Sequence, residues 1–259
     1  MELRTDKIRA CFDRKIGNFT ELWNLSTNTN YVRCAPRDPL IELYGLKNGE
    51  RVKLSGHISD VAEAPDALIL SYDSFGEYDI SAKVTCRCEQ DRLVFSAEIC
   101  NHSTIDVTEI LMPHLGGIYL GNGQKDYLIY PHHAGDKTED PVYNYAENRM
   151  TFWRGCSVPF EDIYRREINY CGLASMSWMY YYNSCGGFYI GSHDPRFPVT
   201  GVIAETSGDR ENPWMAFAFR KYQARGNLSD RGLCCMPFRQ GLALWLEGVS
   251  GIHRSLSGF

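Results

Sequence analysis

Strict alternation of apolar and polar side chains constrains this fold more than any other feature of the sequence. It runs from Tyr78 to Cys88, where one parity is apolar and the other polar. After the polar residues 89–91, a second alternating run covers Leu93 to Cys100. Two such runs around a short polar turn are typical of an antiparallel hairpin with one buried face. Cys86 and Cys88 fall on the apolar parity, so both are predicted to be small core residues.

Similar runs recur along the chain, separated by turn signals rich in Gly, Pro, Asn and Asp. This spacing predicts an all-β fold, a large two-sheet antiparallel sandwich with few short helices. The candidate helices are residues 139–148 and 161–167. The other expected strands are residues 3–12, 19–25, 40–46, 51–58, 67–72, 106–112, 127–130, 175–182, 187–192, 199–204 and 214–222.

Composition excludes several classes of protein. Hydrophobic residues make up 44% of the 259 residues and charged residues 23%, which is incompatible with a disordered chain. The net charge of −5 argues against a nucleic-acid partner. No apolar run is long enough for a membrane span, and the N-terminus lacks a secretory signal, so a cytoplasmic location with reduced thiols is expected.

Familiar motifs for nucleotide, metal and nucleophilic chemistry are missing from the sequence. It contains no phosphate-binding glycine loop, no Cys-x-x-Cys pair, no His-Glu-x-x-His helix and no Gly-x-Ser-x-Gly elbow. The neighbouring Cys234 and Cys235 would point apart in a strand and are poor zinc ligands. We therefore expect neither a metal nor a cofactor.

Three segments carry residues suited to binding. Residues 112–118 run into Pro113 and a Gly pair, which predicts a tight bend at a sheet rim. In Tyr130–Gly135, His132 and His133 either hold the loop backbone or contact a polar ligand.

The third segment, residues 170–195, is aromatic on both parities and ends in Ser192-His193-Asp194-Pro195. It is either a central strand buried between two sheets or a platform on which sugars stack. The candidate carbohydrate contacts of the whole chain are Trp178, His132, His133, His193 and Asp194.

These segments resemble a known family. Together with the early Leu22–Leu25 and Asn30–Val32, residues 113–117, 130–135, 174–179 and 187–195 are similar to a poorly characterised bacterial glycoside-hydrolase-like family. In that family a galactose-mutarotase-like supersandwich precedes a (β/α)₈ barrel. The resemblance covers roughly residues 1–225.

The resemblance implies a supersandwich that is accessory to a carbohydrate-active barrel, where it binds glycan or shapes the cleft. The catalytic carboxylates of such enzymes lie on the barrel, which alone takes about 250 residues, so this chain is expected to hold no catalytic residue. Residues 226–259 depart from the family pattern and are interpreted as a divergent tail, the product of truncation or a frame shift. Neither the sugar nor the oligomeric state follows from the sequence.

Two enzymatic alternatives remain. An aldose 1-epimerase, or mutarotase, needs a His acid and a Glu or Asp base beside the sugar ring. His132 or His193 would supply the acid and Glu205 the base, although no sequence spacing links them. Direct hydrolysis by a pair of carboxylates has no specific support, since 32 acidic residues always offer some pair.

Overall fold

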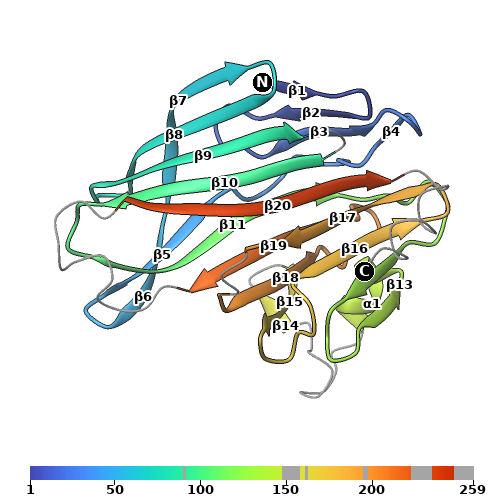
Figure 1. Ribbon diagram of the computed structural model, residues 1–259. Helices are drawn as coiled ribbons and strands as arrows, with labels where there is room; N and C mark the ends of the chain where they lie inside the picture. Colours follow the sequence, from blue (N-terminus) through green and yellow to red (C-terminus); the bar gives the residue numbers. More distant parts are fainter. Residues whose placement is uncertain (90–91, 148–157, 161–162, 195–197, 223–234, 248–259) are drawn as a thin grey trace.

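The computed structural model describes residues 1–89, 92–147, 158–160, 163–194, 198–222 and 235–247 (Figure 1). The chain forms one short helix, α1 (Pro141–Glu147), and strands in three antiparallel sheets. The strands are β1 (Glu2–Arg4), β2 (Ile8–Phe12), β3 (Phe19–Asn24), β4 (Thr29–Asn30), β5 (Glu42–Lys47), β6 (Glu50–Leu54), β7 (Gly56–Ala64), β8 (Ala67–Phe75), β9 (Ile80–Glu89), β10 (Arg92–Asn101), β11 (Asp106–Ile118), β12 (Tyr127–Tyr130), β13 (Asp136–Glu139), β14 (Val158–Phe160), β15 (Ile163–Tyr170), β16 (Trp178–Asn183), β17 (Gly186–Ser192), β18 (Thr200–Thr206), β19 (Met215–Tyr222) and β20 (Cys235–Glu247).

Two large sheets form the sandwich. The nine-stranded sheet has the order β13-β12-β16-β17-β20-β10-β9-β8-β7, and the seven-stranded sheet has the order β14-β15-β18-β19-β11-β5-β6. Aromatic rings of the two sheets pack against each other. The ring centroids of Phe188 and Tyr181 in the first sheet lie 5.3 and 5.7 Å from that of Phe217 in the second. The four-stranded sheet β1-β2-β3-β4 joins the same core through Phe19, whose ring lies 6.2 Å from Phe95. The expected large all-β sandwich is confirmed.

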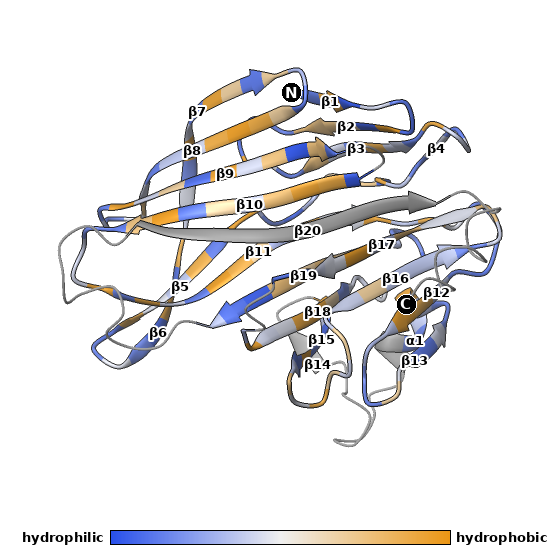
Figure 2. Ribbon diagram, viewed as in Figure 1, coloured by the Kyte–Doolittle hydropathy of each residue, from blue (hydrophilic) through white to orange (hydrophobic). Residues whose placement is uncertain are grey.

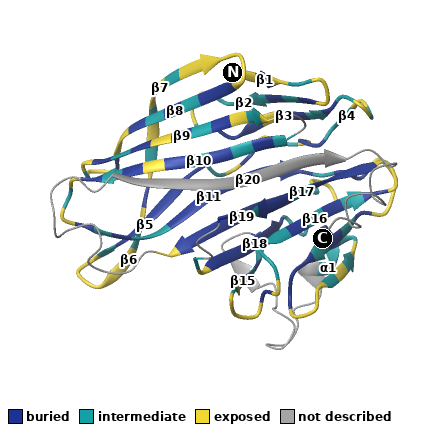
Figure 3. Cartoon of the chain, viewed as in Figure 1, coloured by how far each residue is buried: buried dark blue, intermediate teal, exposed yellow. Residues whose placement is uncertain are grey.

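The hairpin predicted from alternation is β9 and β10. Cys88 pairs with Leu93 and Cys86 with Phe95 in its register. Cys86 is buried and Cys88 packs against the core, as their parity predicts. Buried and more open positions alternate along β9 and β10 (Figure 3), and Figure 2 shows the hydropathy of the residues on the same strands.

Three local predictions need correction or completion. Residues 163–170 form strand β15 rather than a helix, whereas the short helix α1 falls inside the other predicted helix. Residues 112–118, predicted to bend, belong to β11, which is irregular there, with a cis peptide before Pro113 and two register shifts against β19. Within the predicted tail, residues 235–247 form β20, which lies between β17 and β10, and the rest of the tail lies outside the described residues.

The middle of the seven-stranded sheet is buried on both faces. Every residue of β18 is buried, and every residue of β19 except the last (Figure 3). Val202 and Phe217 point into the main core. Ile203 and Ala218 point to the opposite face, where they belong to a separate small apolar cluster. On this outer face, side chains of the sheet itself therefore bury one another. In the described part of the chain, no helix is long and apolar enough to span a membrane.

Candidate functional site

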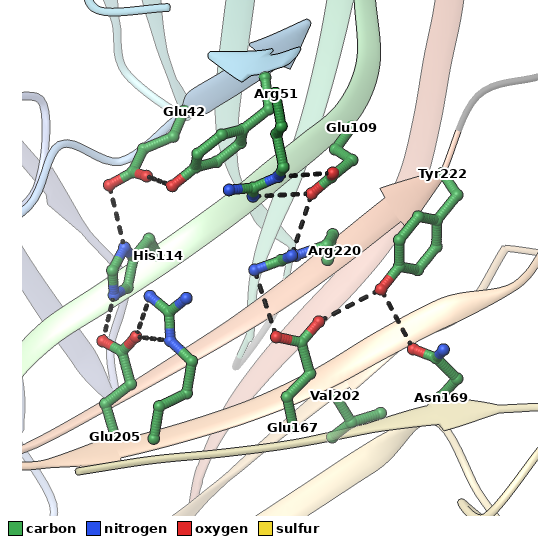
Figure 4. A network of polar contacts seen from close by, with 12 residues as sticks. Glu42, Arg51, Glu109, His114, Glu167, Asn169, Val202, Glu205, Arg220 and Tyr222 are labelled. Atoms are coloured by element: carbon green, nitrogen blue, oxygen red, sulfur yellow. Dashed lines mark hydrogen bonds and ion pairs between the residues drawn. The ribbon is translucent and has the colours of Figure 1, made fainter. Parts of the chain in front are cut away.

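A charged network covers the outer face of the seven-stranded sheet (Figure 4). At one end, the imidazole of His114 on β11 lies between two carboxylates, one on the adjacent strand β5 and one on β18, two strands away. Its Nε2 is 2.9 Å from Oε2 of Glu205 on β18, and its Nδ1 is 3.5 Å from Oε1 of Glu42 on β5. Arg165 Nε donates to the second oxygen of Glu205 at 2.6 Å, and Lys53 Nζ is 3.0 Å from Glu42. The three buried groups Glu42, His114 and Glu205 thus alternate in charge.

Irregular pairing of β11 brings His114 into this position. The register of β11 against β19 shifts between Leu111 and His114, and again between Leu115 and Ile118. An extra residue in one strand re-aims the side chains that follow it. His114 is 2% exposed, so it is held inside the sheet face rather than at a mobile rim.

The surrounding charges keep both His114 and Glu205 ionised at neutral pH. Burial alone would lower the pKa of His114, but the Glu205 and Glu42 carboxylates raise it to about 10. Burial alone would raise the pKa of Glu205, but His114 and Arg165 lower it to about 2. Burial would also raise the pKa of Glu42, but the contacts with His114, Tyr44 and Lys53 lower it to about 2. His114 is therefore an imidazolium with two carboxylates.

The other end of the outer face carries a second ionic chain. Arg51 on β6 makes two hydrogen bonds to Glu109 on β11, at 2.8 and 2.9 Å. Glu109 in turn accepts from Arg220 on β19, which pairs with Glu167 on β15 at 3.2 Å. Tyr222 donates to Glu167 at 3.2 Å. Strands far apart in sequence are tied together by these contacts, as Figure 4 shows.

A cavity of about 170 Å³ lies beside His114. It is lined by Asn18, Ala35, Arg37, Asp38, His114, Gly116, Gly117, Trp214 and Ala216. Burial raises the pKa of Asp38, which also pairs with Arg37 at 3.4 Å. The amide of Asn18 donates to the backbone carbonyls of Asp38 and His114, at 2.9 and 2.6 Å, and so ties the cavity wall to β11. An indole ring with charged and amide groups around it suits a small polar ring as ligand.

The same place holds the one set of potential metal ligands found among the described residues. Donor atoms of Asp38, His114 and Glu205 lie within 4.8 Å of one another. A metal requires a neutral imidazole, whereas His114 is protonated up to about pH 10. Arg165 and Arg37 already pair with the two carboxylates. A metal ion here would have to displace the His114 proton and both arginine pairs.

Of the predicted sugar contacts, Trp178 and His193 come together. Both flank Tyr189, whose ring centroid is 5.6 Å from that of Trp178 and 5.8 Å from that of His193. Tyr189 and His193 are also joined by a 3.1 Å contact between hydroxyl and Nε2. These rings lie on the nine-stranded sheet and not on the outer face that carries His114.

His132 and His133 adjoin each other, with ring centroids 4.2 Å apart, in a loop that pairs with residues 173–175, just before β16. His132 is buried, with its Nδ1 3.0 Å from Asp136, while His133 is exposed at a positive φ of 51°. Asp194 is 5% exposed and so offers little surface to a ligand. Two of the predicted contacts, Trp178 and His193, thus share one ring cluster, and two others, His132 and His133, adjoin each other.

Comparison with known proteins reveals similarity at the level of structure only. No family model matches the sequence, and no curated protein matches it. A galactose mutarotase related enzyme from Lactobacillus acidophilus superposes with a TM-score of 0.53 at 8% identity, covering 96% of this chain and 97% of that one. The fold is galactose mutarotase-like.

The same fold occurs as part of a larger enzyme. The α-N-acetylgalactosaminidase NagBb from Bifidobacterium bifidum matches 96% of this chain with a TM-score of 0.56 at 11% identity. The match spans 36% of that enzyme. A galactose mutarotase-like sandwich of this size therefore occurs both over nearly a whole chain and as about a third of a glycosidase.

Proposed function

We propose that this chain binds carbohydrate in the cavity beside His114, and that it acts as an accessory, cleft-shaping sandwich of a glycoside-hydrolase-like protein. The proposal rests mainly on the cavity, which is lined by Trp214 together with the polar residues Asp38, Arg37 and Asn18. An aromatic surface with a few fixed polar groups is the usual form of a small-ligand site. The names of both structural neighbours, a mutarotase-related enzyme and a glycosidase, support a sugar as the ligand.

Binding is favoured over turnover by the charge states. A general acid and a general base work best when their pKa values lie near the operating pH. His114, at about 10, holds its proton at neutral pH, and Glu205, at about 2, does not accept one. Their strong mutual pairing opposes the proton transfers that ring opening needs.

The alternative function is that of a free-standing aldose 1-epimerase. It is favoured by one observation: a His and a Glu lie 2.9 Å apart beside the cavity, with Asp38 on the cavity wall. The pair is His114 with Glu205, not His132 or His193 as the sequence suggested. Polarimetry on freshly dissolved α-galactose and α-glucose separates the two functions. Accelerated mutarotation would establish the epimerase, and an unchanged rate would leave binding alone.

Calorimetry with galactose, glucose and N-acetylgalactosamine tests the binding proposal. Trp214→Ala removes the ring from the cavity wall and should weaken binding about tenfold, the effect of losing roughly 1.4 kcal/mol. Trp23→Ala is the matched control, since Trp23 lies on β3 outside the cavity lining. The proposal fails if none of the three sugars binds, or if both variants bind like the wild type.

The accessory role makes a separate prediction at the level of the gene. If this sandwich serves a barrel, the neighbouring DNA should encode one in some reading frame. Its absence nearby would remove the accessory role and leave a sugar-binding sandwich. The domain division at residue 225 likewise stays a prediction.

A further inference from the structure

A row of aromatic side chains lies on the outer face of the nine-stranded sheet. In β16, Met179 and Tyr181 point into the core, so residues 178, 180 and 182 point away from it. Neighbouring strands add further rings on the same side, paired in register with these. We call this row the aromatic strip: Trp178, Tyr180, Tyr182, Tyr189, Tyr127 and His193.

The strip consists of two stacks. Tyr180 and Tyr182 lie 4.9 Å apart and nearly parallel, at 20°, and Tyr127 stacks on Tyr182 at 5.5 Å and 29°. Trp178, Tyr189 and His193 form the other stack, with centroid separations of 5.6 and 5.8 Å. All five Trp and Tyr residues are half-buried and His193 is exposed, so parts of the rings remain open to solvent.

Glycines on β17 leave room beside the strip. Gly191 is paired with Trp178, and a Cβ there would overlap the ring and hydroxyl of Tyr189 on the same strand. Gly187 is paired with Tyr182, and a Cβ on it would come within 2.5 Å of the Tyr182 Cβ and close to the Tyr181 carbonyl. A side chain at Gly191 would therefore collide with the Tyr189 ring, and one at Gly187 with the neighbouring strand.

The ammonium group of Lys137 lies at one end of the strip. The Lys137 ammonium lies 4.2 Å from the Tyr127 ring centroid and 5.7 Å from that of Tyr182. Lys137 is exposed and forms no ion pair with an acidic side chain of the described residues, whereas the nearby Glu139 is paired with Lys125. The pKa of Lys137 is raised, first by a hydrogen bond with Tyr182 and to a smaller extent by Glu139, so its charge is partly compensated but exposed at the end of the strip.

The strip differs in character from an apolar protein-docking patch. The large hydrophobic side chains that are most exposed in the described chain, Leu173, Val199 and Tyr222, all lie outside it. Its rings instead carry hydroxyls and an imidazole at their edges, which can hydrogen-bond to a polar ligand. Such mixed surfaces suit a ligand with alternating apolar CH faces and hydroxyl groups, as in a sugar chain.

We propose that the aromatic strip binds an acidic polysaccharide, with sugar rings stacked along the tyrosines and Trp178 and a sugar carboxylate paired with Lys137. The charge complementarity at Lys137 selects the acidic over the neutral chain. This site goes beyond the cavity at His114, shares no residue with its lining, and does not depend on the cavity binding a sugar.

Polygalacturonate and its methyl ester form a matched pair of probes, because the ester keeps the sugar backbone and removes the charge. Affinity electrophoresis of the full chain in gels containing either polymer, or alginate, measures binding. The wild type should be retarded by the acids and less by the ester. Trp178→Ala should weaken retardation about tenfold, the magnitude of a lost aromatic contact. Trp178→Phe, which keeps a ring, should retain most of it.

Lys137→Gln separates charge from stacking. This exposed substitution should bring the affinity for polygalacturonate down to that for its ester and abolish the dependence on salt. Trp214→Ala, in the cavity, should leave retardation unchanged, so that failure of either site can be told apart from failure of the other. Thermal melts of each variant show that it is folded.

Three results would overturn the proposal: no retardation by polygalacturonate or alginate, equal retardation by acid and ester, or normal retardation of a folded Trp178→Ala variant.

Discussion

Glu205→Gln tests whether the buried pair with His114 stabilises the fold. The carboxyl is 1% exposed and its pKa falls from the ordinary 4.5 to about 2. At about 1.4 kcal/mol per pH unit, this shift corresponds to roughly 3 kcal/mol. The raised pKa of His114 reflects the same contacts and is not added to it. Because the variant also leaves His114 and Arg165 without their anion, we expect a loss of about 3–5 kcal/mol in the free energy of unfolding at pH 7.

The two shifted pKa values determine how the stability difference between wild type and variant changes with pH. A lowered folded-state pKa contributes stability that is full above pH 4.5 and is lost as the pH falls through about 2. On the alkaline side, the raised pKa of His114 contributes stability that is full below pH 6.5 and is lost as the pH rises through about 10. The difference between wild type and Glu205→Gln should therefore be largest from pH 5 to 6.5.

Urea denaturation followed by circular dichroism at pH 3, 5, 6.5 and 9 measures this difference. Glu63→Gln is the control, since Glu63 is 43% exposed in its pair with Arg14 and such surface pairs contribute at most about 1 kcal/mol. The reasoning is refuted if Glu205→Gln lies within about 1 kcal/mol of the wild type at pH 6.5. A loss that stays constant between pH 6.5 and 3 would refute it equally.

Three further predictions concern packing, backbone and thiols. Phe188→Ala, at a fully buried ring between the two sheets, should lower the free energy of unfolding by about 3–5 kcal/mol in the same denaturation assay. Gly117→Ala should cost more than about 1 kcal/mol, because φ is +73° there and a Cβ would overlap a backbone carbonyl of the cavity wall; an unchanged midpoint would contradict this. A thiol reagent should modify the exposed Cys171 and Cys185 quickly in the native protein, and Cys86, buried with a raised pKa, only after unfolding; mass spectrometry of the labelled peptides distinguishes them.

The fold was largely predictable from local pattern. Period-two alternation identified β9 and β10 because one face of each strand is buried and the other is open. β15 was misassigned as a helix because its sequence, with Arg165, Arg166 and Glu167, lacks clear alternation. Its charges are accounted for by partners on other strands: Arg165 pairs with Glu205 and Glu167 with Arg220. A local sequence pattern cannot reveal pairing between residues so far apart in the chain.

The site was predictable only in fragments. The segment containing His114 stood out in the sequence, and Glu205 was named as a possible base, but 91 residues separate them. Their contact depends on the order β18-β19-β11 and on the register shift at His114, neither of which alternation reveals. The aromatic segment was identified correctly as unusual. Burial between two sheets, one of its two alternatives, holds for one parity only: Tyr181 is fully buried, while Trp178 stays half-open.

The network that covers the outer face also limits what the cavity can do. Both carboxylates beside His114 also have a second cationic partner, Lys53 for Glu42 and Arg165 for Glu205. A mutarotase cycle would require His114 to give up its proton and Glu205 to accept one, at the expense of the same pairing. Sites that stabilise a fold through satisfied charges commonly lose the poised groups that catalysis needs. This trade-off supports the proposal that the cavity beside His114 binds a sugar without interconverting its anomers.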